Sequence, residues 1–180
     1  MGVSQCSYFA PRHVRPLGRC VRRTLTINGG TPTSNYYVFD GEHWVVEYAS
    51  DGTIASNVLY GRGMDEVIAR GVNGVGWWYF PDRNGNISVI TDGINTVRES
   101  YRYDAFGLPS VYSGTGAYLG NNSAIGNRFI FTGREWRSLF GFFEYRARAY
   151  TIRLIHWGWT LLVTSSRVLA TPSPSDKLRK

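Results

Sequence analysis

The sequence predicts an all-β fold in which about a dozen short strands form an antiparallel meander of hairpins. The chain has 180 residues, enough for one domain, with 21 glycines and 15% aromatic residues. Short runs of β-branched and aromatic residues alternate with small polar turn residues along most of the chain. Four pairs favour tight hairpin turns, namely Asp40-Gly41, Asp51-Gly52, Asn84-Gly85 and Asp92-Gly93.

The best-defined hairpins lie in the middle of the chain, in residues 77–107. Successive side chains of a strand point to opposite faces. Glu99 and Tyr101 therefore share one face with Tyr103, whereas the arginines between them take the other face. Asp104 is suited to accept backbone N–H groups across the following bend, and Gly107 to take the left-handed conformation there.

Two stretches carry a family resemblance. Residues 101–107, YRYDAFG, follow the pattern Y-x-Y-D-x-x-G of the YD repeat. Residues 127–150 contain NRFIFTGREW and GFFEYRARAY, which resemble the F-x-F-T-G-R-E and Y-Y-Y-R-A-R-Y-Y runs of the same family. The chain is identified as a member of the Rhs (rearrangement hotspot)/YD-repeat family, as a fragment of its RHS repeat-associated core domain, over residues 16–153.

The resemblance assigns structural roles to the residues of these motifs. They are Tyr101, Tyr103, Asp104, Gly107, Phe129, Phe131, Gly133, Arg134, Tyr145 and Arg148. We expect the second stretch to form a hairpin, with Phe129 and Phe131 on one strand and Phe143, Tyr145 and Ala147 on the other. The aromatic residues expected to pack best are Tyr101, Tyr103, Phe106, Phe129, Phe131, Phe143 and Tyr145.

In this family the repeats wind into a single-layer β-shell that encloses a C-terminal toxin, or form an extracellular scaffold. The resemblance thus implies a structural role, with the remaining repeats and a toxin payload as partners, and a sheet that is wetted on both faces. The family can cut its own chain near an Asp-Pro pair that this sequence lacks, so we assign no catalytic residue and expect no enzyme. Exposed Trp, Tyr and Arg leave an alternative open, a module that binds carbohydrate or another surface ligand.

Two shorter stretches suggest chemistry at first sight. Asp65 and Glu66 are adjacent, and adjacent strand residues point to opposite faces, so a turn cap plus a strand charge is favoured over a carboxylate pair. Residues 70–76 form a glycine-rich loop, but they lack the Lys-Ser/Thr of a phosphate-binding loop and precede a strand. The sequence therefore predicts no cofactor.

Composition limits the remaining possibilities. The net charge is +7, and 18 of the 20 basic residues are arginine. The arginines alternate with tyrosines and form no basic block, so we expect stacking and ion pairs and no nucleic-acid binding. Cys6 and Cys20 are expected to be free thiols, and the three histidines have no partner at metal-binding spacing. The sequence shows neither a membrane-spanning run nor a signal peptide, although the family implies a secreted or cell-envelope location.

The ends of the chain match the family less well. Residues 1–15 match no motif, and residues 154–180 diverge from the family pattern. A frameshift near Arg153 would explain the divergence, and we expect disorder beyond Ala170 because Ser, Thr, Pro and Lys are frequent there. A fragment of a shell would leave strand edges unpaired, so we expect the isolated chain to self-associate.

Overall fold

Residues with β-branched and aromatic side chains form short strands throughout the computed structural model, which describes residues 2–8, 20–27, 30–145, 148–152, 159–164 and 167–172. Side chains are described for residues 20–27, 30–145 and 150–152. Within these ranges the helical structure is the short turn η1 (Phe131–Gly133), so the all-β prediction is confirmed. None of the described residues belongs to a helix long and apolar enough to cross a membrane.

The strands are three to eight residues long. They are β1 (Gly2–Tyr8), β2 (Cys20–Ile27), β3 (Thr33–Asp40), β4 (His43–Tyr48), β5 (Ile54–Tyr60), β6 (Val67–Val72), β7 (Val75–Pro81), β8 (Ile87–Thr91), β9 (Val97–Tyr103), β10 (Pro109–Ser113), β11 (Tyr118–Gly120), β12 (Glu135–Arg137), β13 (Phe142–Tyr145), β14 (Arg148–Thr151), β15 (Trp159–Thr164) and β16 (Arg167–Pro172).

Strands β1 to β11 follow one another in space as they do in sequence, and each pairs antiparallel with the next. The main sheet continues from β1 to β16 and β15, and its two end strands, β11 and β15, are not paired with each other. A second sheet has the order β12-β13-β14. The predicted hairpin meander is therefore confirmed, and the sheet that it forms is open.

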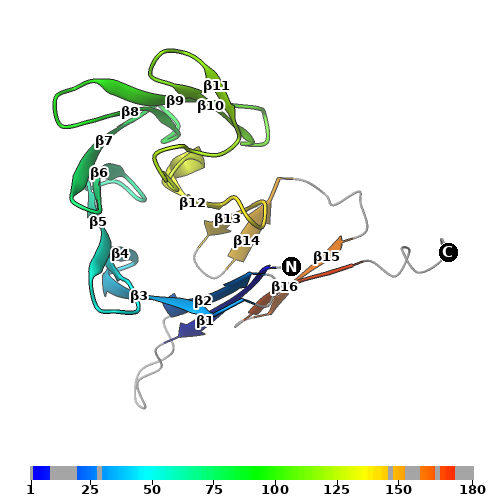
Figure 1. The fold of residues 1–180 in the computed structure, drawn as a ribbon. Coiled ribbons are helices and arrows are strands. Elements are labelled where there is room, and N and C mark those ends of the chain that lie inside the picture. Colours follow the sequence, from blue (N-terminus) through cyan, green and yellow to red (C-terminus); the bar gives the residue numbers. More distant parts are fainter. Residues whose placement is uncertain are drawn as a thin grey trace.

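The main sheet bends into an arc around the second sheet. Figure 1 shows β2 to β11 following this arc, with η1 and strands β12 to β14 on its inner side. We call residues 123–134, which run from the end of β11 to the start of β12, the inner segment. The arc gives the main sheet a concave face, which the inner segment covers, and a convex face turned outward.

The hairpins at Asp82 and Asp104 share one turn geometry. The Asp104 N–H donates to the Leu108 carbonyl, and one carboxylate oxygen accepts the N–H groups of Phe106 (2.9 Å) and Leu108 (2.8 Å). Asp82 makes the equivalent bonds three residues before Gly85. Gly85 (φ 79°) and Gly107 (φ 90°) are both left-handed, which completes a three-residue loop with a bulge.

The turn predicted at Asp92-Gly93 forms with the same geometry, but Gly93 is not the residue that takes the left-handed conformation. The residue with positive φ is Asn95 (63°), three positions after Asp92, and Asp92 accepts the N–H groups of Ile94 and Thr96. The aspartate therefore determines where the turn begins, and the left-handed position falls on the third residue that follows it.

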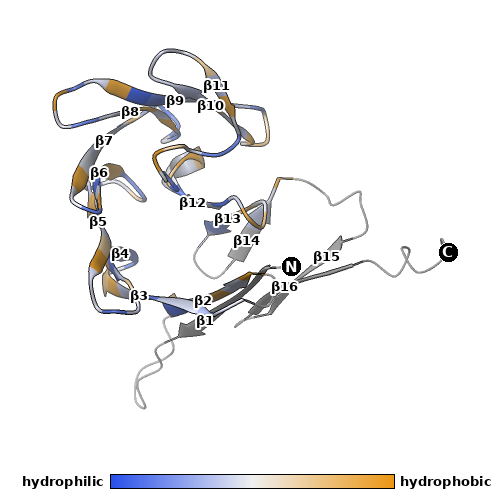
Figure 2. Ribbon diagram, viewed as in Figure 1, coloured by the Kyte–Doolittle hydropathy of each residue, from blue (hydrophilic) through white to orange (hydrophobic). Residues whose placement is uncertain are grey.

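Buried residues alternate with more exposed ones in the middle of β5 and β9, as period 2 requires. Figure 2 shows hydrophobic and hydrophilic residues interspersed along these strands. On β9, Glu99 and Tyr101 are buried and Arg98 and Arg102 are exposed, as predicted. The expectation of a sheet wetted on both faces is wrong, because the inner segment and the second sheet bury the concave face.

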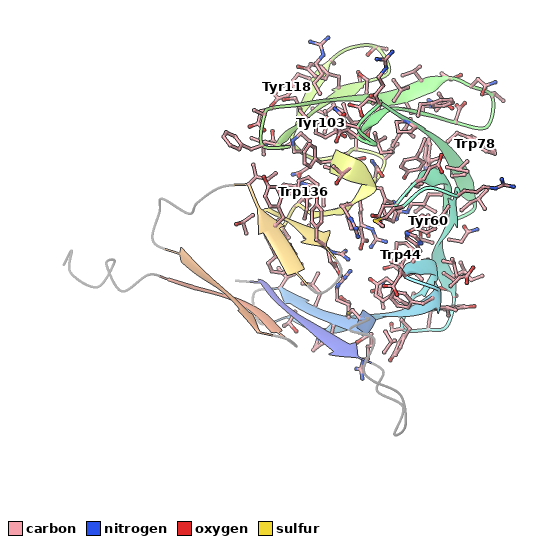
Figure 3. All side chains as sticks on the ribbon, turned by 180° about the vertical axis from the view of Figure 1, so that it is seen from behind. Trp44, Tyr60, Trp78, Tyr103, Tyr118 and Trp136 are labelled. Carbon is pink, nitrogen blue, oxygen red and sulfur yellow. The ribbon has the colours of Figure 1, made fainter. Side chains whose placement is uncertain are left out.

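The hydrophobic core lies between the concave face and the inner elements. In Figure 3, Trp44, Tyr60 and Tyr103 lie on the inner side of the arc and Trp78 on its outer side. The buried core residues are Tyr37, Trp44, Val58, Val67, Tyr79, Ile87, Ile90, Tyr101, Val111, Phe129, Ile130, Trp136 and Phe143.

Two stretches rich in small polar residues and glycine contain strands. Residues 70–76, predicted as a glycine-rich loop, form the β6–β7 hairpin, in which Asn73 (φ 49°) and Gly74 (φ 80°) make a two-residue turn between paired Val72 and Val75. Residues 113–127, in which Gly, Asn and Ser are frequent, include β11, which pairs with β10. The pair Asn73-Gly74 is itself a hairpin signal. Gly71 and Gly76 on either side of it made the stretch resemble a loop.

The predicted pairing of Phe129 and Phe131 with Phe143 is wrong. Phe131 belongs to the turn η1, and Phe129 makes one isolated bridge to Glu135. β13 pairs on one side with β14 and on the other with β12, which is three residues long and places Trp136 opposite Phe143. The positive φ of Thr132 (52°) and Gly133 (68°) ends the extended conformation before a longer strand can form.

Both ends of the chain contribute strands to the main sheet. β1 lies within the unmatched residues 1–15, and β15 and β16 lie within the divergent residues 154–180. The predicted disorder beyond Ala170 falls mostly outside the described residues, although β16 extends to Pro172. Cys20 is disulfide-bonded, so the expectation of a free thiol at this position is wrong.

Candidate functional site: the interface between the curved sheet and the inner segment

The inner segment meets the sheet first at Glu99, which is 1% exposed on the concave side of β9. One oxygen of its carboxylate accepts the backbone N–H groups of Ala124 (2.6 Å) and Ile125 (3.2 Å). The other oxygen accepts the hydroxyl groups of Ser123 (2.7 Å) and Tyr101. The buried charge is thus matched by four donors, two of which belong to the main chain.

Asn127 is the next point of attachment. Its side-chain oxygen accepts the Tyr79 hydroxyl at 2.8 Å, and its NH₂ donates to the Tyr101 hydroxyl at 3.1 Å. The same amide also bonds the N–H (3.0 Å) and the carbonyl (2.8 Å) of Phe129. Burial raises the pKa of Tyr79 to about 12, so this hydroxyl stays protonated as a donor at neutral pH.

Arg70 of β6 binds a backbone carbonyl of the inner segment, that of Gly126. It is 5% exposed, and it donates to the Gly126 carbonyl at 2.7 Å and to the Ser56 hydroxyl at 2.8 Å. Among the described residues no carboxylate forms an ion pair with it, and burial lowers the pKa of its guanidinium. A buried cation is therefore matched mainly by a carbonyl of the inner segment.

Phe129 is the main apolar anchor of the inner segment. Its ring lies among those of Trp44 (5.6 Å between centroids), Tyr60 (6.3 Å) and Tyr79 (6.5 Å), which come from three different strands. The next residue, Ile130, accepts the N–H of Ile87 through its carbonyl at 3.0 Å. Aromatic contacts and a main-chain bond to β8 thus hold the centre of the segment against the sheet.

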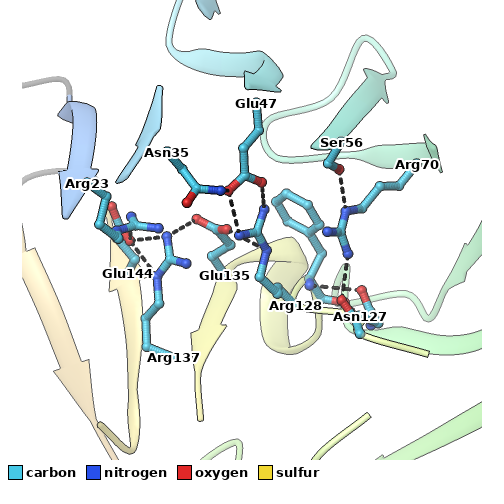
Figure 4. Close-up of polar contacts among 12 residues, drawn as sticks. Arg23, Asn35, Glu47, Ser56, Arg70, Asn127, Arg128, Glu135, Arg137 and Glu144 are labelled. Atoms are coloured by element: carbon cyan, nitrogen blue, oxygen red, sulfur yellow. Dashed lines mark hydrogen bonds and ion pairs between the residues drawn. The ribbon is translucent and has the colours of Figure 1, made fainter. Parts of the chain in front are cut away.

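Three arginines and three glutamates form a buried charge network beside this anchor, drawn in Figure 4. The ion pairs are Arg128–Glu47 (2.5 Å), Arg128–Glu135 (3.1 Å), Arg137–Glu135 (2.5 Å), Arg137–Glu144 (2.7 Å) and Arg23–Glu144 (2.7 Å). They connect β2 and β4 of the main sheet with the inner segment, β12 and β13. The network is electrically neutral, which is the condition under which buried charges are tolerated.

Two carboxylates of this network, those of Glu135 and Glu47, stay ionised. Burial by itself would raise the pKa of Glu135, but Arg137 and Arg128 hold it at about 2. Burial also opposes ionisation of Glu47, and Arg128 nevertheless lowers the pKa of that carboxyl below its ordinary value. A general acid or base needs a pKa near the working pH, so these two groups are suited to holding elements together. No group of three metal-ligating side chains occurs in the described part of the chain.

Asp65 anchors the far end of the inner segment. Arg134 lies 2.5 Å from one oxygen of Asp65, and His43 lies 3.2 Å from the other. A Cβ atom on Gly133 would lie 2.2 Å from the Asp65 carbonyl oxygen, so the two backbones touch here. Glu66, which precedes β6, accepts the N–H of Gly63 at 2.8 Å and so caps this turn.

Two residues named by the family resemblance, Tyr103 and Gly107, meet a third, Phe131. Tyr103 (5.7 Å between centroids) and Phe143 (5.8 Å) pack on its ring, and a Cβ atom on Gly107 would lie 2.6 Å from it. Tyr103 also donates to the Ile87 carbonyl at 2.6 Å.

Tyr145 is held nearby, within hydrogen-bond distance of Thr132 (2.7 Å) and beneath the Arg134 guanidinium. The backbone of Arg148, at the start of β14, pairs with Tyr145 at the end of β13, and the Arg148 side chain lies outside the described residues. Phe106 is 66% exposed, so its predicted packing is wrong.

No sequence pattern assigns a role to Glu47, Arg70, Asn127 or Arg128, although these residues carry much of this interface. Trp44 and Glu47 are both buried although they lie three residues apart on β4, because a bulge interrupts the strand between them; strict alternation would have placed them on opposite faces. Asn127 and Arg128 lie outside any regular strand, and no local pattern indicated their roles.

No protein-family model matches this chain, and no curated protein matches it.

Proposed function

We propose that this chain is a structural section of a β-shell of the Rhs/YD-repeat kind and has no independent catalytic activity. The observation that carries the proposal is the open, curved meander whose concave face is lined with buried polar groups and covered by chain from beyond the last hairpin. In such a shell the remaining repeats would pair with the free strands, and a toxin payload would be the cargo. The shell itself would be secreted or lie at the cell envelope.

The recurring turn supports this proposal. Asp82, Asp92 and Asp104 form the same loop at the ends of successive hairpins. Repeated units of one geometry build a regular curvature and need neighbours to cover their edges. The end strand β11 has three residues, and Tyr118 and Leu119 on it are exposed. Such an edge is a template for a further strand.

Self-association of the isolated chain tests this proposal. We expect oligomers that increase with salt, because salt screens the repulsion from a net charge of +7. Light scattering after size exclusion at low and high salt would measure them. Leu119→Lys, which places a charge on the free edge, should reduce association, whereas Leu59→Lys on the convex face is the matched control. A cooperative monomer at both salt concentrations would contradict the proposal.

A second candidate function is the binding of carbohydrate or another surface ligand. Trp78 and Phe80 lie two residues apart on the convex side of β7 and are 44% and 49% exposed. Aromatic rings in a row on a sheet can stack on sugar rings. Binding on a glycan array that Trp78→Ala abolishes would favour this function, and an array without any signal would contradict it.

A further inference from the structure

We propose that the concave face is a peptide-binding surface whose ligand is the inner segment, residues 123–134, and that this face accepts the segment from a second copy of the chain. The contacts between the sheet and the segment carry this inference, whether or not the chain belongs to a larger shell.

The first part of the segment is recognised through its main chain. Glu99 accepts two consecutive N–H groups, those of Ala124 and Ile125, and Arg70 donates to the Gly126 carbonyl. An anion and a cation on the sheet thus face the two polar groups of the peptide backbone. Both side chains are at least nine-tenths buried. Water therefore has little access to their charges while the segment is in place, and the segment supplies hydrogen-bond partners instead.

The second part of the segment is recognised through two side chains. Asn127 is bonded by Tyr79 on one atom and by Tyr101 on the other, so both its donor and its acceptor are matched. Phe129 fills the space between rings from β4, β5 and β7. The site therefore selects an asparagine followed, two positions later, by an aromatic residue.

The segment is tied to the sheet by an exposed connection. Asn122, in the connection between β11 and the segment, is exposed, and so is the turn that precedes β11 at residues 114–117. All the contacts that hold residues 123–134 on the strands are non-covalent. A second copy presents the same groups, and exchange of one element between identical chains adds no new kind of contact.

The experiment uses the full chain with a site-specific protease sequence inserted between Thr115 and Gly116, at the exposed loop tip. After cleavage we expect residues 1–115 and 116–180 to elute together, to separate in denaturant and to reassociate when it is removed. A labelled 116–180 fragment from a second preparation should then exchange into the cleaved protein.

The decisive comparison uses two variants of the 116–180 fragment, each of which differs from the wild-type fragment by one added negative charge. Asn127→Asp places a carboxylate beside Tyr101 and Glu99 and removes the NH₂ donor, so we expect at least tenfold weaker competition for the cleaved wild-type protein. Asn122→Asp makes the same chemical change at the exposed connection and should compete like the wild type. Only the added fragment varies, so the folding of a variant full chain does not affect the result.

Separation of the two wild-type parts after cleavage would overturn the proposal. Equal competition by the Asn127→Asp and Asn122→Asp fragments would overturn it as well, because the inner segment would then not be what the sheet recognises.

Discussion

Replacing Arg128 with methionine should destabilise the protein far more than replacing an arginine on the convex side. Arg128 bonds Glu47 at 2.5 Å, lies 3.1 Å from Glu135 and packs over the Trp44 ring at 5.2 Å. Methionine retains most of the apolar stem, so the packing on Trp44 is largely preserved. The change therefore removes the cation and little else.

The magnitude follows from what remains around the two glutamates. Glu135 keeps its ion pair with Arg137, whereas the donors that remain to Glu47 (3% exposed) among the described residues are neutral, namely Asn35 (2.8 Å) and Tyr37 (3.0 Å). Removing one partner of a buried ion pair costs about 3–5 kcal/mol. We expect a loss of about 3 kcal/mol, at the lower end of this range, because Glu47 is not left without donors.

Urea unfolding of the purified variants measures the free energy of unfolding. Adding Glu47→Gln to Arg128→Met should recover about 2 kcal/mol, because no uncompensated charge is then buried. The matched single variant is Arg98→Met, which breaks an ion pair with Asp92 on a half-exposed arginine and should cost less than about 1 kcal/mol.

Two results would refute this reasoning about Arg128. Equal losses for Arg128→Met and Arg98→Met would mean that the buried network contributes no more than an exposed ion pair. Strictly additive effects of Arg128→Met and Glu47→Gln would mean that the two charges are not coupled.

Three further predictions concern other features of the interface. The pKa of Glu135 is lowered from 4.5 to about 2, so its stabilisation of about 3 kcal/mol is present above pH 4.5 and is lost as the pH falls toward 2; acid titration of the unfolding free energy should show this loss, and Glu135→Gln should flatten the curve. Gly107→Ala should lower the melting temperature more than Gly85→Ala, since both positions have positive φ but only Gly107 has a ring in the way; equal shifts would contradict the contact. Phe143→Ala, at a residue with no exposed surface, should cost about 3–5 kcal/mol in urea unfolding, and Phe106→Ala less than about 0.5 kcal/mol; a similar cost for both would contradict the core described here.

The sequence alone determined the local architecture of this protein. The hairpin at Asp104–Gly107 followed from residues five positions apart at most, because an aspartate that accepts nearby N–H groups and a left-handed glycine define the turn between them. The inward face of β9 followed from period 2, which placed Glu99 with Tyr101. Both features depend on neighbours in the chain, which the sequence contains.

Only the tertiary structure determined what covers the concave face. Arg128 pairs with Glu47 across 81 positions and Arg23 with Glu144 across 121, and the sequence indicates the charges but not which of them meet. Asn127 lies in no regular strand, and its bonds to Tyr79 and Tyr101 exist only because the curved sheet brings these two residues to it. The physical reason is curvature: the small bend at each hairpin accumulates over many strands, and the buried partners depend on the whole arc.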